Sequence, residues 1–248
     1  MAGLTQKQMQ QYQSDGFTIL KGVFSKKECE DFIEHMMDLH SGRKCLEGFK
    51  PHGPDGWGRT HNQHLYDPRA LNFLIDARLK QPLEDCFKDK VEGIQTMYFW
   101  KGTEQVRHQD QSPLPGCMSA WIPLIDVDLD NGTIWLQKGS HKGSLVLRET
   151  ALLENGETDH PLRARLTQEI FEENDLSEIP AICSQGDVVL FSGRVIHRGG
   201  PIGKPSSFRH VLANHYIPYS FDEWPHVTWP RISFDGTRRF TDGKVAPE

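Results

Sequence analysis

The pattern of this chain changes near residue 91, and the change leaves few folds open. Before it, Thr5 and Ser25 are N-cap candidates for helices over 5–15 and 25–40, and apolar residues recur at helical spacing over 69–87. After it, short apolar segments separated by Gly, Pro and Asn/Asp turns continue to about residue 220. Because helices and strands do not alternate, we expect a mainly β domain, a barrel or sandwich with flanking α-helices.

One domain is expected over residues 1–248, since 248 residues suffice for a single large core. It would consist of a helical portion over about 1–90, a β-core over about 91–220 and a C-terminal extension over 221–248. Strands are predicted over 94–100, 117–124, 132–135, 187–192 and 208–216. The Gly- and Pro-rich stretch 42–68 predicts a long loop, and the charged stretch 148–178 predicts an insertion with a helix near 166–174.

Charge and composition exclude several classes of partner. The net charge of -6 disfavours nucleic acid, because phosphate backbones attract basic proteins. No apolar stretch approaches the roughly 18 residues of a membrane-spanning helix, and the N-terminus lacks the pattern of a signal peptide. The five cysteines are scattered and never form a CxxC, which favours reduced thiols. We therefore expect a cytoplasmic protein that binds neither nucleic acid nor membrane.

The segment 105–111 is the most informative for chemistry. Side chains two residues apart on a strand share a face, so His108 and Asp110 would direct an imidazole and a carboxylate toward one point. These are two of the three ligands of a facial triad that binds iron(II). Alone, the pair is weak evidence, because a chain with 12 histidines can contain such a pair by chance.

Two residues further along could complete such a site. His197 follows the apolar segment 187–192 and precedes Gly199 and Gly200, a position from which it can act as a third ligand at the mouth of a barrel. The alternative is a half-buried strand histidine bonded to a backbone carbonyl. Arg209 begins an alternating strand, and an inward-facing arginine is costly to bury unless it meets a carboxylate.

Taken together, these segments resemble the phytanoyl-CoA dioxygenase family of iron(II)- and 2-oxoglutarate-dependent oxygenases. The resemblance covers roughly residues 5–220. Besides His108-Gln109-Asp110, it rests on Trp121, Asn131-Gly132, the GSHKGSL run at 139–145, the segment from Gly186-Asp187 to His197, and Phe208-Arg209. The chain departs from the family where Gln137-Lys138 precede the GSH and where Arg198 replaces a small residue after the histidine. Neither departure touches a ligand, but both make the substrate pocket less predictable.

The resemblance implies a double-stranded β-helix, that is, a cupin-like jelly-roll barrel. It also implies that His108, Asp110 and His197 hold Fe(II), and that Arg209 pairs with the distal carboxylate of 2-oxoglutarate, while O2 takes a remaining position on the metal. Thr133 could add a hydroxyl to the same carboxylate, or be an ordinary β-branched strand residue. Because Asp110 is retained, where related halogenases have Gly or Ala, hydroxylation is favoured over halogenation.

Several residues are candidates for contact with substrate. Alternation divides the strand 95–101 into two sets, one with Gln95, Met97 and Phe99 and one with Thr96, Tyr98 and Trp100, and either set could line the cavity. Tyr98 and Trp121 are candidate pocket walls or, alternatively, core aromatics. The other candidates are the lid residues Arg59, His61 and Asn62, and Arg198, which either favours an anionic substrate or faces solvent.

The sequence thus predicts an Fe(II)- and 2-oxoglutarate-dependent dioxygenase with a small-molecule substrate. We expect it to hydroxylate an unactivated C–H bond of a polar or anionic molecule, such as a phosphonate or an amino or organic acid, with release of succinate and CO2. An acyl-CoA hydroxylase of the same family is the alternative within the enzyme class. The alternative from another class is a non-catalytic jelly-roll module that binds a small molecule, which would not need an arginine for a cosubstrate.

Overall fold

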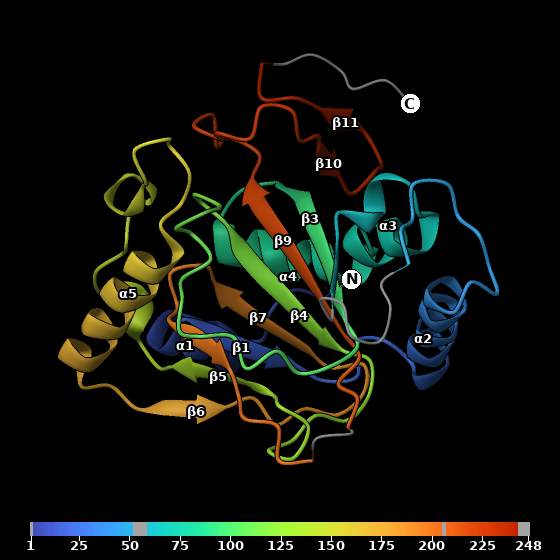
Figure 1. Cartoon of the computed structure of the whole chain (residues 1–248), viewed down its shortest axis with the longest axis horizontal. Helices are drawn as coiled ribbons and strands as arrows, with labels where there is room; N and C mark the ends of the chain where they lie inside the picture. Colours follow the sequence, from blue (N-terminus) through green and yellow to red (C-terminus); the bar gives the residue numbers. More distant parts are fainter. Residues whose placement is uncertain (1, 52–58, 205–206, 243–248) are drawn as a thin grey trace.

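The computed structural model describes residues 2–51, 59–204 and 207–242 of the chain (Figure 1). The first helices, α1 (Gln6–Asp15) and α2 (Lys26–His40), both start with the predicted N-caps. Thr5 and Ser25 each accept a hydrogen bond from the backbone of the third helical residue, whose side chain returns the bond to the cap. Within the described ranges, no helix has both the length and the apolar character needed to cross a bilayer.

The helix predicted over 69–87 is in fact two helices, α3 (Pro68–Leu74) and α4 (Ala77–Phe87). Asp76 explains the break, because its side chain accepts a hydrogen bond from the backbone of Arg78 and starts a new helix. Between strands, α5 (His160–Asn174) begins six residues before the predicted stretch, where Asp159 caps it. The remaining helices are single 3-10 turns at Gln63–Leu65, Ser140–Lys142 and Arg148–Ala151.

Eight strands form the large antiparallel sheet. Its order is β1-β7-β4-β9-β3-β10-β11, with β2 paired to β3. The strands are β1 (Phe17–Leu20), β2 (Arg59–His61), β3 (Val91–Phe99), β4 (Met118–Pro123), β7 (Val188–Ser192), β9 (Val211–Pro218), β10 (Arg231–Ser233) and β11 (Arg238–Arg239). The segment beyond residue 220 thus adds an edge to this sheet, where the buried carboxylate of Glu92 accepts from Arg231 at 2.6 Å and Arg239 at 2.7 Å.

Three short strands form the small sheet, in the order β6-β5-β8. They are β5 (Ile134–Gln137), β6 (Glu178–Pro180) and β8 (His197–Gly199). The two sheets together give the mainly β architecture that was predicted, a jelly-roll. In the part of the chain that the structure describes, however, the sheets do not close into a barrel.

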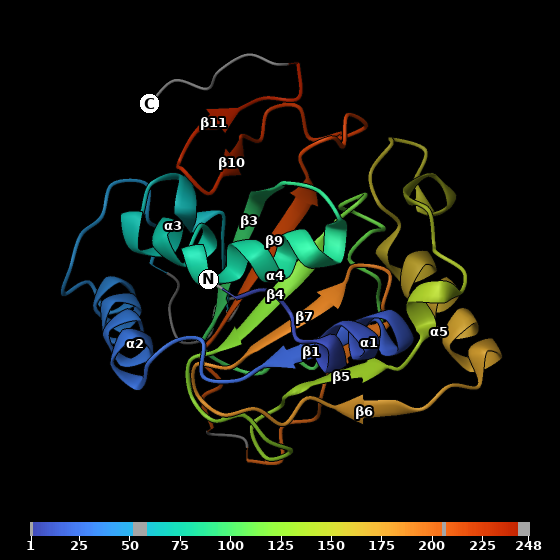
Figure 2. The ribbon, with the colours of Figure 1, turned by 180° about the vertical axis from the view of Figure 1, so that it is seen from behind.

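The large sheet is buried on both faces. Helices α3 and α4 cross its back, as Figure 2 shows, and Leu74, Leu79 and Leu83 pack there against Tyr98 and Leu190. The opposite face meets the small sheet through a second cluster. That cluster includes Phe99, Trp121, Val189, Phe191, Ala213, Ile134 and Leu136. Because successive side chains alternate between faces, each long strand contributes to both clusters, and the space between the sheets is where the site lies.

Candidate active site

His108 and His197 are direct neighbours across a backbone bridge. The amide of His108 donates to the carbonyl of His197 at 2.9 Å, and the amide of His197 donates to the carbonyl of His108 at 3.0 Å. Directly opposed residues on antiparallel strands place their side chains together. The two imidazole rings accordingly lie side by side, with centroids 4.1 Å apart.

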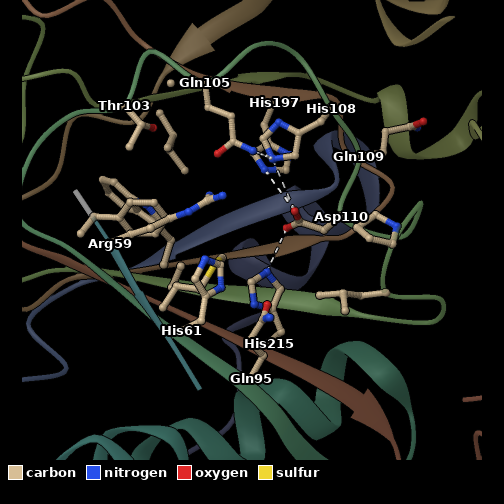
Figure 3. A pocket seen from close by; sticks show the side chains of 18 of the residues that line it. Arg59, His61, Gln95, Thr103, Gln105, His108, Gln109, Asp110, His197 and His215 are labelled. Atoms are coloured by element: carbon tan, nitrogen blue, oxygen red, sulfur yellow. Dashed lines mark hydrogen bonds and ion pairs between the residues drawn. The ribbon is translucent and has the colours of Figure 1, made fainter. Parts of the chain in front are cut away.

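The ring nitrogens of both histidines are assigned by their partners. In each ring Nδ1 donates to the carbonyl two residues earlier, to Val106 at 2.8 Å and to Val195 at 3.0 Å. In a neutral imidazole this leaves the lone pair on Nε2. Both Nε2 atoms lie 3.6 Å from Oδ1 of Asp110 (Figure 3), and the three ligand atoms lie within 4.8 Å of one another.

Asp110 is held from the side of the large sheet. Its Oδ2 accepts from the hydroxyl of Ser119 on β4 at 2.7 Å and from Nε2 of His215 on β9 at 3.3 Å, as Figure 3 shows for His215. These bonds occupy one carboxylate oxygen and leave the other directed at the two imidazoles. His215 is therefore a buried support of the site.

Electrostatics favours a neutral His108 ring and a charged Asp110 carboxylate. Burial, and then the neighbouring His197, lower the pKa of His108 to about 3. Burial alone would raise the pKa of Asp110, but His197, His215 and His108 outweigh it and hold that pKa well below its usual range. Neutral imidazoles with an ionised carboxylate are the donor set of a divalent transition metal, and the residues present fit Fe(II).

The segment between His108 and Asp110 is anchored to the GSHKGSL run. Gln109 is buried, and its amide donates to the carbonyls of Ser144 at 3.0 Å and Arg194 at 2.8 Å, while its oxygen accepts from the backbone of Val146. The hydroxyl of Ser140 accepts a hydrogen bond from the backbone of Ile196, next to His197. The motif thus positions the segments that carry the candidate metal-binding residues.

Arg209 is a buried cation without a carboxylate partner among the described residues. Its side chain donates to the carbonyl of Gly132 at 2.9 Å and stacks near Phe99 and Trp121, while its Nε has no partner there. Burial lowers the pKa of Arg209 to about 10, so the group remains charged at neutral pH. A buried unpaired cation is costly, which points to an anionic ligand at this position.

A cavity of about 300 Å³ joins the imidazoles, Asp110 and Arg209. A family model described as phytanoyl-CoA dioxygenase (PhyH) matches residues 12–211. The chain belongs to this family. The protein is accordingly a dioxygenase whose cofactors are iron(II) and 2-oxoglutarate.

Related proteins and solved structures agree with this membership. Phytanoyl-CoA dioxygenase 1 of Oryza sativa subsp. japonica is 26% identical, over 91% of this chain and 93% of that protein. Phytanoyl-CoA dioxygenase domain-containing protein 1 of Bos taurus is 27% identical, over 80% of this chain and 85% of that protein. The structure of HygX from Streptomyces hygroscopicus with nickel and 2-oxoglutarate bound has a TM-score of 0.64 at 18% identity, over 90% of each chain. The structural likeness supports the fold.

The walls of this dioxygenase's cavity settle which face of β3 is used. Gln95, Met97 and Phe99 line the cavity, whereas Tyr98 lies on the opposite face and its hydroxyl bonds to Nδ1 of His210 at 2.6 Å. The expectation that Tyr98 forms a pocket wall is therefore corrected: its alternation places it in the core behind the sheet. Trp121 does line the cavity.

The lid candidates divide in the same way. Arg59 and His61 line the cavity (Figure 3), but they belong to β2, which pairs with β3 and is part of the large sheet. Asn62 is not among the lining residues; it occupies a left-handed conformation at the start of the next turn, with φ of 54°, and its backbone donates to Thr96. Residues 52–58 of the predicted loop lie outside the described residues.

Two other candidates have bonds that limit their part in binding. Arg198 borders the cavity, but its guanidinium donates to both oxygens of Glu178 at 2.9–3.1 Å. Thr133 is fully buried and donates its hydroxyl to the carbonyl of Ala181 at 2.5 Å. A hydroxyl has one proton, so in this arrangement Thr133 cannot also donate to a carboxylate.

Sequence reasoning missed several residues of the cavity wall. They are Gln95 as a definite wall residue, Thr103, Gln105, Arg163, His226 and Trp229. Gln105 lies three residues before His108, and its amide donates to Nε2 of His108 at 3.2 Å. His226 stacks on Trp229 at 4.6 Å beside the cavity. Of these residues, only Gln95 could have been found from the sequence, through the two-residue period of β3.

Proposed function

We propose that the protein hydroxylates an unactivated C–H bond of a small polar or anionic molecule and converts 2-oxoglutarate to succinate and CO2. In this proposal His108, Asp110 and His197 hold Fe(II). Arg209 pairs with the distal carboxylate of 2-oxoglutarate. The observation that carries the proposal is the convergence of the three ligand atoms within 4.8 Å, in one cavity with the unpaired guanidinium of Arg209.

The chain's own residues divide the work around the metal. Bound iron supplies the activation of dioxygen, and a donor set of two imidazoles and one carboxylate leaves positions for a keto acid and O2. The planar guanidinium of Arg209 suits a carboxylate because it donates two parallel hydrogen bonds and so fixes the direction of the keto acid. Phe99, Trp121 and Phe191 exclude water from the space between.

The cavity favours a small substrate. Its volume of about 300 Å³ is at the lower end for ligand sites, and the cosubstrate would take part of it. The amides of Gln95 and Gln105 and the hydroxyl of Thr103 provide polar contacts for a polar molecule. An acyl-CoA substrate is the second candidate, favoured by the names of the relatives; only its acyl end would fit inside such a cavity.

We also infer a cytoplasmic location. All five cysteines are free, at Cys29, Cys45, Cys86, Cys117 and Cys183. Burial raises the pKa of Cys29, Cys86 and Cys183 to about 12 in each case, which keeps these thiols protonated. Unpaired thiols suit a reducing compartment.

The test begins without oxygen. Addition of Fe(II) and 2-oxoglutarate to the wild-type protein should produce the weak visible charge-transfer band of the chelate, and admission of air should release succinate. His108→Ala should abolish both signals, while Arg209→Gln should raise the concentration of 2-oxoglutarate needed for the band by more than tenfold. Arg165→Gln, at an exposed position on α5, is the matched control and should leave both signals unchanged.

Thermal melting of each variant confirms that it folds. Absence of the band from folded wild-type protein at saturating 2-oxoglutarate would overturn the proposal and favour the non-catalytic binding module. Unchanged turnover in His108→Ala or Arg209→Gln would show that the residue roles are wrong.

A further inference from the structure

Arg163 brings a second unpaired cation to the cavity from outside both sheets. It lies in the first turns of α5, in the long connection between β5 and β6, beside the small sheet (Figure 1). Its side chain is half-buried and lines the cavity together with the three proposed iron ligands. Its guanidinium bonds to Nδ1 of His160 at 3.1 Å, and no carboxylate of the described residues lies within ion-pair distance.

Other arginines of this region have partners. Arg107 and Arg198 share the carboxylate of Glu178, with hydrogen bonds of 2.9–3.1 Å. Arg194 donates to the backbone carbonyls at 141 and 143 and so holds the GSHKGSL run. Arg163 therefore differs from its neighbours, because its charge faces the cavity without a neutralising acid.

The surroundings of Arg163 show how near it lies to the reacting centre. Burial lowers the pKa of Arg163, and the charge of Asp110 partly opposes that shift. Arg163 in turn helps to lower the pKa of His108. Asp110 is the only carboxylate that lines the cavity within the described residues, and in the proposed function its charge is taken up by iron. The field of Arg163 is then left for another anion.

We propose that Arg163 binds an anionic group of the substrate, a carboxylate or a phosphonate, and thereby makes a short organic anion the substrate class. The inference rests on the proposed function and deepens it. Arg209 and Arg163 then have separate tasks: the first receives the cosubstrate's distal carboxylate, and the second receives the substrate's anionic group. A guanidinium fork matches two oxygens of either anion.

The rest of the cavity suits the body of such a molecule. Met97, Leu114 and Trp229 supply apolar surface, against which a short carbon chain can lie with its C–H bonds facing the metal ligands. Trp229 is held by its stack with His226, whose Nε2 donates to the carbonyl of Pro113 at 2.9 Å. An apolar wall with a charged anchor fixes both position and orientation.

Direct binding to the anaerobic Fe(II)·2-oxoglutarate enzyme tests the inference. Isothermal titration would use two probes, methylphosphonate and propionate, with methyl propionate as the neutral counterpart. We expect the wild-type protein to bind at least one anion at least tenfold more tightly than the ester. Arg163→Gln should weaken that binding at least tenfold, and Arg163→Lys should weaken it less, since it keeps the charge but loses the fork.

The matched control is Arg165→Gln on the same helix, because Arg165 is 68% exposed and already near Glu169 at 3.9 Å. It should bind the probes like the wild type. Preference for methylphosphonate would indicate a phosphonate substrate, and preference for propionate would indicate a carboxylate.

Three results would overturn the inference. The first is that neither anion binds the wild type more tightly than the ester, and the second is that Arg163→Gln binds the anions as tightly as the wild type. The third is that Arg163→Gln loses as much affinity for 2-oxoglutarate as Arg209→Gln does, which would assign Arg163 to the cosubstrate. The charge-transfer band distinguishes failure of this inference from failure of the proposed function. If the band forms normally but the protein does not bind the anionic probes, the inference about Arg163 is wrong and the proposed function stands.

Discussion

The large and small sheets differ in length, burial and task. Strands β3 and β9 of the large sheet have nine and eight residues, and most of their side chains are buried. Strands β6 and β8 of the small sheet have three residues each, yet β8 contributes His197 and its neighbouring bridge contributes His108. Long buried strands supply cohesion, whereas short strands hold reactive groups. Asp110 joins the two sheets, because His108 and His197 approach it from the small-sheet side while its supports Ser119 and His215 are on β4 and β9.

A substitution in the core of the large sheet gives the strongest test of whether the two sheets have separate tasks. Leu190 on β7 is fully buried and lies opposite Ala120 and Thr18. We expect Leu190→Ala to lower the free energy of unfolding by about 2–5 kcal/mol, through lost burial and a residual cavity. The folded fraction should still form the Fe(II)·2-oxoglutarate band at the wild-type metal concentration. Denaturant melts and metal titrations measure the two quantities separately.

Leu136 on β5 is the comparison for Leu190. It is equally buried, but it lies directly opposite His197 in the small sheet. Leu136→Ala should destabilise the protein and also weaken metal binding. If Leu190→Ala weakened metal binding as much as Leu136→Ala does, the two sheets would not have separate tasks.

Ser119 on β4 supports Asp110 where the two sheets meet. Ser119→Ala removes the 2.7 Å hydrogen bond to Oδ2 of Asp110, so the carboxylate is less firmly directed at the imidazoles. We expect Fe(II) affinity to fall about 10–100-fold, as for other residues that orient metal ligands. Ser112→Ala is the control, since Ser112 is also buried but its hydroxyl has no partner among the described residues. Equal Fe(II) affinities in the two variants would remove Ser119 from the site.

We expect acid to lower the stability of the protein through His64, which contacts the large sheet. Burial, and then Arg238, lower the pKa of His64 from 6.5 to about 3, and its Nδ1 lies 3.0 Å from the hydroxyl of Thr96 on β3. Below pH 6.5 the unfolded chain gains a proton here that the folded chain does not, so stability falls as the pH drops toward 3. At pH 5 the loss is about 2 kcal/mol, from 1.5 pH units at about 1.4 kcal/mol each.

His64→Gln tests this sign and size. Urea melts at pH 7 and pH 5 should show a difference in unfolding free energy that is smaller by about 2 kcal/mol in the variant than in the wild type. An identical pH dependence of the two proteins would mean that His64 accepts a proton in the folded state.

The smallest loss of stability is expected at the start of α2, away from the space between the two sheets. Ser25→Ala removes the cap of α2 and should cost about 1 kcal/mol of stability. Metal and 2-oxoglutarate affinities should not change. A change in either affinity, measured by the charge-transfer titration, would show that α2 is coupled to the site.

The sequence predicted those parts of the molecule that depend on local spacing. His108 and Asp110 lie close together, as their two-residue spacing predicted, although the strand expected there is only an isolated bridge at His108 followed by a turn at Asp110. The caps of α1 and α2 are the predicted residues Thr5 and Ser25. Both are visible in short windows. The family resemblance then supplied expectations for His197 and Arg209, and the structure brings these four side chains into one cavity.

The remaining features depend on contacts between distant segments. Nothing in β3 alone shows whether Tyr98 or Phe99 faces the cavity, because both faces of this strand are buried. Arg163 and Trp229 reach the cavity from the β5–β6 connection and from beyond β9, where the sequence has no period to follow. The sequence did not predict the break between α3 and α4, because apolar residues continue at helical spacing across the capping residue Asp76.

The paired backbone bonds between residues 108 and 197 make strand register a condition for activity. A slip by one residue would turn the imidazole of His197 to the other side of its strand and present Ile196 or Arg198 instead. The rest of the jelly-roll could still assemble around that error. A preparation can then contain well-folded but inert molecules, and the active fraction counts those in which these two segments of the chain met in the correct alignment.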